Sequence, residues 1–286
     1  MDLRKARQIV QKALEEDVGA GDVTSEWTVA AETLASGRMI AKEAGVICGL
    51  DVARLVFQEL DREIDFTSRV RDGDRVTAGD GIARIEGPAR GILTGERVAL
   101  NFLQRMSGIA TMTARYAEAV RGTGARILDT RKTTPGLRML EKYAVRCGGG
   151  ENHRFGLYDM VLIKDNHIAA SGGIGEAVQN AKCKMQSVKC KMPIEVEVKN
   201  LSELADALEV GVDRIMLDNM SVEEMRQAVE EVRKVSDAVE IEASGGVTLA
   251  HLREIAETGV DFISVGALTH SPQALDVSLV FYPAMG

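Results

Sequence analysis

The second half of the chain alternates short apolar runs with helical stretches, and this pattern restricts the fold more than any other feature. The candidate strands are residues 126–130, 160–164, 194–198, 214–218, 239–243 and 262–266. Two of the intervening stretches open with helix-capping signals, since Asn200 and Ser221 each stand three residues before a glutamate. Consecutive strand–helix units predict a parallel sheet, because parallel strands need a crossover connection that is usually a helix.

Each of these candidate strands ends in, or is followed closely by, residues that can do chemistry. In chain order these are Thr130-Arg131-Lys132, Lys164, Glu197, Asp218, Ser244-Gly245-Gly246, and Gly266-Ala267 with His270 just beyond. An open sheet gathers function at its switch point, whereas a barrel brings all its carboxyl strand ends to one mouth. We therefore predict a TIM-like α/β barrel. Since about six strands are plain, the prediction includes an incomplete barrel of six to seven strands.

The first part of the chain has a different texture. Residues 3–16 predict an amphipathic helix, and Gly49 opens a second helix. Asp/Gly turns between short alternating runs in residues 64–93 predict a small antiparallel β unit. This pattern resembles biotinyl and lipoyl carrier domains, but its candidate hairpin tips contain no lysine, which disfavours a carrier role. Residues 93–121 predict a long helix with one buried face, interrupted near Ser107-Gly108.

The chain contains a cluster of basic side chains although its net charge is negative. Lysine and arginine number 35 against 43 acidic residues, a net charge of −8, yet residues 126–164 hold Arg131, Lys132, His153, Arg154 and Lys164. A cationic pocket in an acidic protein indicates a small, strongly anionic ligand. Nucleic acid is disfavoured as a partner, because the chain has no long basic face and only 4% aromatic residues.

The cysteines and the N-terminus bear on localisation. No two of the four cysteines form a CxxC pair, and Cys147 is interpreted as a small packing residue. A reduced cytosolic pair is favoured over a disulfide for Cys183 and Cys190. No apolar run approaches the length needed to span a membrane, and the N-terminal helix does not read as a signal peptide. We expect a cytoplasmic protein without a membrane partner.

The turns after the last two strands suggest a phosphate site. Ser244, Gly245 and Gly246 follow one strand, and Val265, Gly266, Ala267 and His270 follow the next. Each could be a tight turn and nothing more, but two in succession favour phosphate binding by backbone N–H groups. Glu197 and Asp218 can pair with the cations opposite, bind ribose hydroxyls, or hold Mg²⁺, a metal that prefers oxygen ligands. Magnesium is therefore the expected cofactor.

These segments together are similar to the quinolinate phosphoribosyltransferase family, also called nicotinate-nucleotide pyrophosphorylase (carboxylating). The segments that carry the resemblance are EDVGAGDVTS, GERVALNFLQRMSGIAT, TRKTTPGLR, GGGENHRFGLYDMVLIKDNHI, IEVEVKN, IMLDNM, IEASGGV and VGALTHS. The resemblance implies that quinolinate and phosphoribosyl pyrophosphate react with Mg²⁺ to give nicotinate mononucleotide, pyrophosphate and CO₂, on the de novo route to NAD.

The resemblance also implies an architecture. It places an N-terminal α/β sandwich in residues 1–108, an α/β barrel in 109–270, and a tail in 271–286 that packs on the first domain. It implies a homodimer with shared active sites, or a hexamer built from such dimers. Arg105 would reach into the neighbouring barrel, although a lone helix arginine is more often simply solvated.

Residue roles follow from the resemblance. The catalytic residues would be Lys132, Lys164, Glu197 and Asp218, with Glu197 and Asp218 also holding the metal and the ribose hydroxyls. The substrate-binding residues would be Arg105, Thr130, Arg131, Lys132, His153, Arg154, Lys164, Glu197, Asp218, Ser244, Gly245, Gly246, Val265, Gly266, Ala267 and His270. The two quinolinate carboxylates would be neutralised by Arg105, Arg131, Lys132, His153, Arg154 and Lys164.

Three other interpretations compete with this one. The first is a phosphoribosyltransferase for nicotinate or another pyridine or pyrimidine acid, although a monocarboxylate needs fewer cations. The second is a molybdenum-transport-associated paralogue on the same scaffold. The third is a phosphate-ligand sensor without catalysis, which would not need Glu197 and Asp218 beside a cationic pocket.

Overall fold

A computed structural model describes residues 1–283 of the chain, which form two compact units. Unit 1 comprises residues 1–114, 133–149 and the segment from Ala267 onward. Unit 2 comprises residues 115–132 and 150–266. The predicted domain boundaries after residues 108 and 270 stay predictions, and residues 284–286 of the predicted tail lie outside the described residues.

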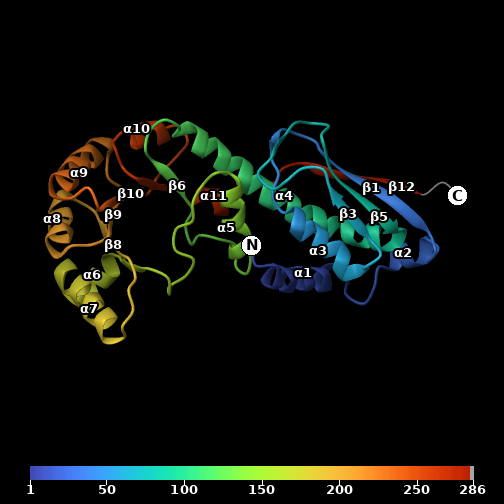
Figure 1. Cartoon of the computed structure of the whole chain (residues 1–286), viewed down its shortest axis with the longest axis horizontal. Coiled ribbons are helices and arrows are strands. Elements are labelled where there is room, and N and C mark those ends of the chain that lie inside the picture. Colours follow the sequence, from blue (N-terminus) through green and yellow to red (C-terminus); the bar gives the residue numbers. More distant parts are fainter. Residues whose placement is uncertain (284–286) are drawn as a thin grey trace. The chain divides into compact units, whose positions relative to one another are not determined.

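Unit 1 is built on a four-stranded antiparallel sheet with the order β12-β1-β5-β3 (Figure 1). Its strands are β1 (Leu34–Ala41), β2 (Gly45–Val46), β3 (Asp65–Ser68), β4 (Arg75–Val76), β5 (Gly81–Pro88) and β12 (Val277–Pro283), of which β2 and β4 form a separate pair. Its helices are α1 (Leu3–Val18), α2 (Val23–Thr28), α3 (Leu50–Leu60), most of α4 (Ala89–Ala119), α5 (Arg138–Cys147) and α11 (Ala267–His270).

The core of unit 1 lies where helices pack closely on one another and on the sheet. Ala6, Val10 and Leu14 are the buried residues of α1, and their spacing of four residues places them on the face that packs on α3. In α4, Gly91 and Gly95 have no Cβ, so side chains of α3 and of the segment after it can approach the helix closely. Phe57 of α3 stacks on Phe66 of β3 with ring centroids 6.0 Å apart. The result is the predicted α/β sandwich.

The predicted interruption of the long helix near Ser107-Gly108 is wrong, because α4 runs without a break from Ala89 to Ala119. The Ser107 hydroxyl accepts a hydrogen bond from the Cys48 backbone N–H at 2.9 Å. At Gly108 a Cβ would collide with the backbone carbonyl oxygen of Gln273. Both residues therefore serve close packing, and a helix tolerates an interior glycine at a cost of about 1 kcal/mol.

Unit 2 is a six-stranded parallel sheet with the order β6-β11-β10-β9-β8-β7. The strands are β6 (Arg126–Leu128), β7 (Val161–Ile163), β8 (Ile194–Val198), β9 (Arg214–Asp218), β10 (Glu240–Ser244) and β11 (Phe262–Ser264). Between residues 1 and 283 no strand pairing joins β6 to β7, so these two strands are the edges of the sheet. This confirms the predicted α/β barrel-like fold of about six strands.

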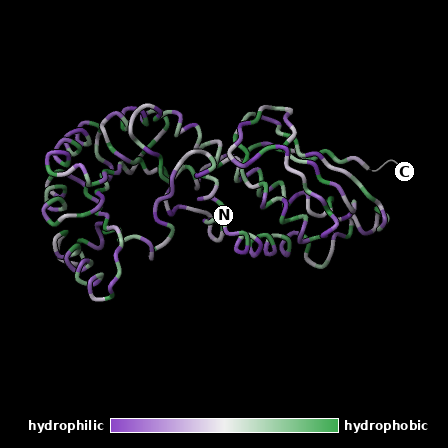
Figure 2. The backbone as a smooth tube through the Cα atoms, in the orientation of Figure 1, coloured by the Kyte–Doolittle hydropathy of each residue, from purple (hydrophilic) through white to green (hydrophobic). Residues whose placement is uncertain are grey.

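The helices of unit 2 lie around the outside of the curved sheet (Figure 1). They are α6 (Asp165–Ser171), α7 (Ile174–Ser187), α8 (Leu201–Val210), α9 (Val222–Val235) and α10 (Leu252–Ala256). Hydrophobic and hydrophilic residues alternate along α9 in Figure 2, as expected for a helix that buries one face. The predicted capping box is present: the Ser221 backbone N–H donates to Glu224 Oε2 at 2.8 Å, and the Ser221 hydroxyl accepts from the Glu224 N–H at 3.3 Å.

None of the helices within residues 1–283 is both long enough and apolar enough to cross a bilayer. The longest, α4, covers 31 residues, but charged and polar side chains recur along its length. Its apolar positions are used to pack against the rest of unit 1, with Leu103 and Ile109 fully buried.

Candidate active site

A cavity of about 540 Å³ lies at the carboxyl edge of the parallel sheet in unit 2. Residues at or just beyond the ends of all six strands contribute to its wall. The lining residues are Thr130, Arg131, Lys132, His153, Arg154, Leu162, Lys164, Glu197, Met216, Asp218, Asn219, Glu242, Ser244, Gly245, Gly246 and Ser264. The structure thus brings eleven residues of the predicted set into one cavity, namely Thr130, Arg131, Lys132, His153, Arg154, Lys164, Glu197, Asp218, Ser244, Gly245 and Gly246, with Thr130 to Lys132 supplied by one turn.

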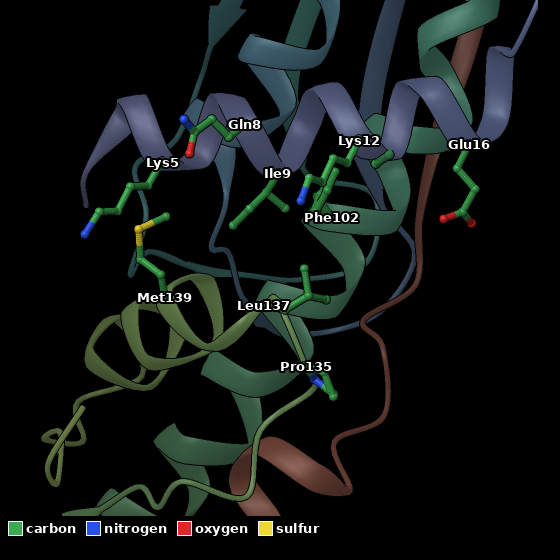
Figure 3. Close-up of a pocket in the computed structure, with 11 residues that line it drawn as sticks. Lys5, Gln8, Ile9, Lys12, Glu16, Phe102, Pro135, Leu137 and Met139 are labelled. Atoms are coloured by element: carbon green, nitrogen blue, oxygen red, sulfur yellow. The ribbon is translucent and has the colours of Figure 1, made fainter. Parts of the chain in front are cut away.

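A second cavity, of about 600 Å³, lies in unit 1 between α1, α4 and the turn before α5. Figure 3 shows the apolar side chains of Ile9, Phe102 and Leu137 near one another, with Lys5 and Glu16 toward its two ends. Its charged groups come from one exposed helix, and no strand end reaches it. The cavity of unit 2 has convergent polar groups from many elements, which is the arrangement expected of an active site.

Cationic side chains form one wall of the unit 2 cavity. Arg131 and Lys132 follow β6, Arg154 lies in the loop before β7, and Lys164 follows β7. Burial and the neighbouring positive charge of Arg131 lower the pKa of the Arg154 guanidinium below its ordinary value. Two guanidinium groups that repel each other in a partly buried wall define a site suited to an anion.

Two carboxylates face this wall from the middle of the sheet. Glu197 is the fourth residue of β8 and Asp218 the last residue of β9. Glu197 forms an ion pair with Lys164, whose side chain is 41% exposed, while that of Glu197 is 8% exposed. The paired strands place Glu197 beside Met216 and Asp218 beside Ser244, so the two carboxylates lie on adjacent strands.

A layer of buried charge lies under the cavity floor. Alternation along β8 and β10 turns Glu195 and Glu242 to the same face as Glu197 and Ser244. His153 Nε2 lies 3.1 Å from Glu195 Oε2 and 3.4 Å from Glu242 Oε2, and Arg214 Nη1 lies 3.4 Å from Glu242 Oε2. Both carboxylates are fully buried, and Glu242 also forms part of the cavity lining.

The charge of His153 depends on two opposed effects. Burial lowers its pKa, but hydrogen bonds to Glu195 and Glu242 and the charges of both outweigh burial and raise the pKa to about 9. The Arg154 backbone N–H points at Nδ1 from 2.7 Å, which favours a ring that keeps a lone pair there. Nε2 carries a proton in both the neutral and the charged ring, because this proton faces the carboxylates of Glu195 and Glu242.

The Ser244-Gly245-Gly246 turn forms the opposite wall. Gly245 and Gly246 have φ of +94° and +59°, and a Cβ on Gly245 would collide with the Asn219 side chain. The Asn219 N–H also donates to the Ser244 carbonyl oxygen at 2.9 Å. This turn requires glycine and exposes backbone rather than side chain to the cavity. The helix after it, α10, starts only at Leu252, so the turn itself is the candidate phosphate cradle.

Five residues of the predicted set do not line the cavity. Among the described residues, Val265 and Gly266 of unit 2 are absent from its wall, and the Val265 N–H donates to the Leu128 carbonyl oxygen at 2.9 Å. Ala267 and His270 begin and end the short helix α11 of unit 1. Arg105 also belongs to unit 1, where its Nη2 donates to Glu141 Oε1 at 2.5 Å and to the Thr134 hydroxyl at 2.7 Å.

Sequence reasoning missed five cavity residues and one residue beneath them. Those in the wall are Leu162, Met216, Asn219, Glu242 and Ser264, and Glu195 lies below. Glu195 and Glu242 could have been found, because IEVEV and EIEAS each place carboxylates two residues apart on one face of a strand. Strand ends alone do not define the site, because the cavity reaches one layer deeper.

Two family models together match most of the chain. The model described as the N-terminal domain of quinolinate phosphoribosyl transferase matches residues 22–107. The model described as the C-terminal domain of the same enzyme matches residues 109–280.

Individual relatives extend over nearly the whole chain. A probable nicotinate-nucleotide pyrophosphorylase [carboxylating] of Synechocystis is 48% identical over 271 residues, covering 94% of this chain and 90% of the relative. The protein of the same name from Bacillus subtilis is 45% identical over 265 residues, covering 92% and 89%. Among solved structures, NadC from Streptococcus pyogenes superimposes with a TM-score of 0.93 at 41% identity, covering 100% of this chain and 99% of that one.

Proposed function

Because the chain belongs to the quinolinate phosphoribosyl transferase family, we propose that the cavity of unit 2 is where quinolinate receives its phosphoribosyl group. The enzyme transfers the phosphoribosyl group of phosphoribosyl pyrophosphate to quinolinate with decarboxylation, in NAD biosynthesis. The products are nicotinate mononucleotide, pyrophosphate and CO₂. The single observation that carries the choice of cavity is the convergence of five basic side chains on a wall opposite a glycine turn.

The basic wall suits the two adjacent carboxylates of quinolinate. Arg131 and Arg154 can each grip a carboxylate through two N–H groups, and Lys132 adds a point charge. Their mutual repulsion in the free enzyme is relieved when the dianion binds. The ring nitrogen of quinolinate is then held against the anomeric carbon of the second substrate, which replaces a bimolecular encounter by a fixed geometry.

Charged side chains of the cavity stabilise the charges that develop on the pyrophosphate and on the ribose during transfer. Pyrophosphate leaves the anomeric carbon as an anion, and Lys132 and Lys164 stabilise that charge without reorganisation. The ribose becomes cationic in the same step, and the carboxylates of Glu197 and Asp218 stabilise it and accept hydrogen bonds from its hydroxyls. The 5′-phosphate fits the backbone N–H groups of the Ser244-Gly245-Gly246 turn.

The residues present also fit Mg²⁺. This ion commonly takes one or two protein carboxylates together with substrate phosphates and water, and Glu197 and Asp218 lie on adjacent strands of the cavity. When bound, the ion supplies neutralising charge at the pyrophosphate. Glu197 forms an ion pair with Lys164, and both side chains line the cavity.

Decarboxylation needs orientation and exclusion of water rather than a side-chain nucleophile. N-ribosylation makes the pyridine ring an electron sink. When CO₂ leaves, the electron pair of the broken carbon–carbon bond stays on the ring carbon beside the cationic nitrogen, and that carbon then takes up a proton. The chain's contribution is to hold the departing carboxylate in a partly desolvated place beside the cationic wall. No step requires a cysteine or serine to form a covalent bond.

The proposal extends to assembly and location. We infer a homodimer, or a hexamer of such dimers, in which Arg105 enters the neighbour's cavity. The Arg105 side chain is 35% exposed, and Glu141 and Thr134 fix the position of its guanidinium group, which supports this role. Within the described chain all four cysteines are free, which supports a reducing compartment such as the cytoplasm.

Product release with two substrates tests the proposal. Purified protein with Mg²⁺ and phosphoribosyl pyrophosphate should release CO₂ and pyrophosphate in equal amounts from quinolinate, and little pyrophosphate from nicotinate. Pyrophosphate release from nicotinate without CO₂ would instead assign the chain to the transferases for monocarboxylates. Binding of phosphoribosyl pyrophosphate without release of either product would indicate a ligand sensor.

A further inference from the structure

Two cysteines that the reaction does not use lie together in unit 1. Cys48 stands between β2 and α3 and is fully buried, and Cys147 is the last residue of α5 and is half-buried. Their sulfur atoms and a carboxylate oxygen of Asp72 all lie within 4.8 Å of one another. The pair comes from segments about one hundred positions apart in the sequence, so it is a product of the fold rather than of local spacing.

The segments that carry this pair are fixed by hydrogen bonds. Asp72 Oδ1 accepts from the N–H groups of Gly49 and Leu50 at 3.0 and 3.1 Å and so caps the start of α3. Asp72 Oδ2 accepts from the Tyr143 hydroxyl of α5 at 3.0 Å. Asp72 therefore ties the N-terminus of α3 to α5 and keeps the sulfur of Cys48 close to that of Cys147.

The two thiols differ in ionisation. A hydrogen bond from Cys48 lowers the pKa of the Cys147 thiol, helped by Tyr143 and by the charge of Arg146, against burial and the charge of Asp72. Burial raises the pKa of the Cys48 thiol well above its ordinary value. Cys147 is thus the member that reacts as a thiolate, while Cys48 keeps its proton.

We propose that Cys48 and Cys147 are a redox-active dithiol that hydrogen peroxide oxidises reversibly to an intramolecular disulfide. The Cys147 thiolate attacks one peroxide oxygen, the O–O bond breaks, and hydroxide leaves, so Cys147 becomes a sulfenic acid. The Cys48 sulfur then attacks the Cys147 sulfur, the S–O bond breaks, and water leaves with the Cys48 proton. Overall both sulfurs are oxidised, the peroxide is reduced to two waters, and a dithiol reductant reverses the change.

A metal site is the competing explanation of the cluster. Zinc takes four ligands in structural sites, whereas this cluster offers three ligand atoms among the described residues. Both oxygens of Asp72 already accept hydrogen bonds from N–H and O–H donors, which a cation would have to displace. The geometry therefore favours chemistry between the two sulfurs.

The disulfide would join the start of α3 to the end of α5. Helix α5 also carries Glu141, the buried partner of Arg105, and its end runs directly into the Gly148-Gly149-Gly150 turn. A Cβ on Gly148 would collide with the Ala110 carbonyl oxygen, so this end of α5 sits tightly on α4. Oxidation would restrain the element that holds Arg105 without touching any residue of the unit 2 cavity.

The test uses the full chain with its two exposed cysteines replaced. A Cys183→Ser/Cys190→Ser background leaves Cys48 and Cys147 as the only thiols in the sequence. The protein is reduced, desalted and treated with hydrogen peroxide at equimolar and tenfold ratios, then digested with trypsin. We expect titratable thiols to fall from two to none, peptide 43–54 to become joined to peptide 147–154, and dithiothreitol to reverse both changes.

Further variants separate the roles of the two cysteines. In Cys48→Ser, which keeps a hydroxyl donor at this position, the Cys147 sulfenic acid should persist and be trapped by dimedone, and in Tyr143→Phe the rate of disulfide formation should fall several-fold. Two thiols that stay reduced at a tenfold excess, or a sulfinic acid at Cys147 in the unmodified pair without a joined peptide, would overturn the proposal. So would stoichiometric binding of Zn²⁺ alone that protects both thiols from peroxide.

Discussion

At the scale of single residues, the cavity depends on charges that are held before any substrate arrives. The pair between Lys164 and Glu197 joins adjacent strands β7 and β8 at the cavity wall. An exposed ion pair contributes little to stability, but a partly buried pair holds both side chains in a fixed position. Removing the Lys164 side chain is therefore expected to lower activity much more than it lowers the stability of the fold.

We predict that Lys132→Ala and Lys164→Ala each lower kcat/KM for quinolinate by about 10²–10³-fold, the range seen when one preorganised charge-stabilising group is removed. The circular dichroism spectrum and Tm should change little, since the Lys164 side chain is 41% exposed. Lys234→Ala is the matched control, because it breaks a lysine–glutamate pair with Glu231 on the outer helix α9. Full activity in either cavity variant would remove that lysine from the catalytic set.

The buried histidine gives a prediction about pH. The folded pKa of His153 is raised to about 9 by Glu195 and Glu242, against an ordinary value near 6.5. A raised pKa stabilises the folded state fully below pH 6.5, and this contribution is lost as the pH rises through about 9. The free energy of unfolding should therefore decline over this interval.

Glu242→Gln should bring the pKa of His153 down toward 6.5 and weaken that decline. The chain has four histidines, so ring resonances can be followed by NMR and assigned with a His153→Asn variant. An unaltered His153 pKa in Glu242→Gln would show that Glu195, 3.1 Å from Nε2, raises this pKa without help from Glu242.

At the scale of elements, the turn after β10 is built around glycine. Gly245 has φ of +94° and its hydrogen faces the Asn219 side chain, so an added methyl group is strained both by the backbone and by contact. We expect Gly245→Ala to raise KM for phosphoribosyl pyrophosphate by roughly tenfold or more, since strain of this kind costs about 1–3 kcal/mol. The KM for quinolinate should change less, because quinolinate binds at the opposite wall.

Gly122→Ala is the control for that substitution. Gly122 also has a positive φ, of +81°, but no atom lies near the position of its added Cβ. This variant should lose stability without a change in either KM. Equal effects of the two variants on KM would mean that Gly245 acts through general stability rather than through the phosphate turn.

The same elements show how far the sequence could predict the fold. The parallel sheet and its functional edge were predictable because β8 and β9 are each followed by a helix that opens with a side-chain cap, at Asn200 and Ser221. The unbroken course of α4 was not predictable, because a Ser-Gly pair interrupts some helices and in others allows a neighbouring segment to pack closely against the helix. What decides is the approach of Cys48 and of Gln273, which contact α4 from distant parts of the chain.

The partners of the buried charges beneath the cavity could not be predicted from the sequence. Glu195 is flanked by valine and isoleucine, and only the pairing of β8 with its neighbours shows that His153 lies against it. A buried carboxylate needs a partner, but its identity depends on tertiary contact. Arg105 shows the same limit, because its partner Glu141 lies on another helix.

At the scale of the whole molecule, the chain passes between its two compact units more than once. Residues 133–149, which carry α5, belong to unit 1, although the residues before and after them belong to unit 2. Arg131 and Lys132 therefore stand at one such passage and His153 close to the next. Changes in α5 are expected to affect both units, which is why the state of Cys147 bears on more than its immediate surroundings.

Arg105 supplies the prediction that concerns the assembly. If its guanidinium completes the cavity of a neighbouring subunit, Arg105→Ala and Lys164→Ala homodimers each lack a component of every site. A mixed dimer contains one site with both residues intact. Random exchange of equal amounts should then restore roughly a quarter of wild-type activity, since half of the dimers are mixed and each has one working site.

The control for this experiment mixes Lys132→Ala with Lys164→Ala. Both residues line the same unit 2 cavity, so every site in the mixed dimer keeps one defect and no activity should return. Because Arg105 also pairs with the buried Glu141, the Tm of Arg105→Ala must first show that it folds. If exchanged dimers of Arg105→Ala and Lys164→Ala stay inactive, Arg105 serves its own subunit by holding Glu141, and the cavity of unit 2 does not depend on a neighbour's arginine.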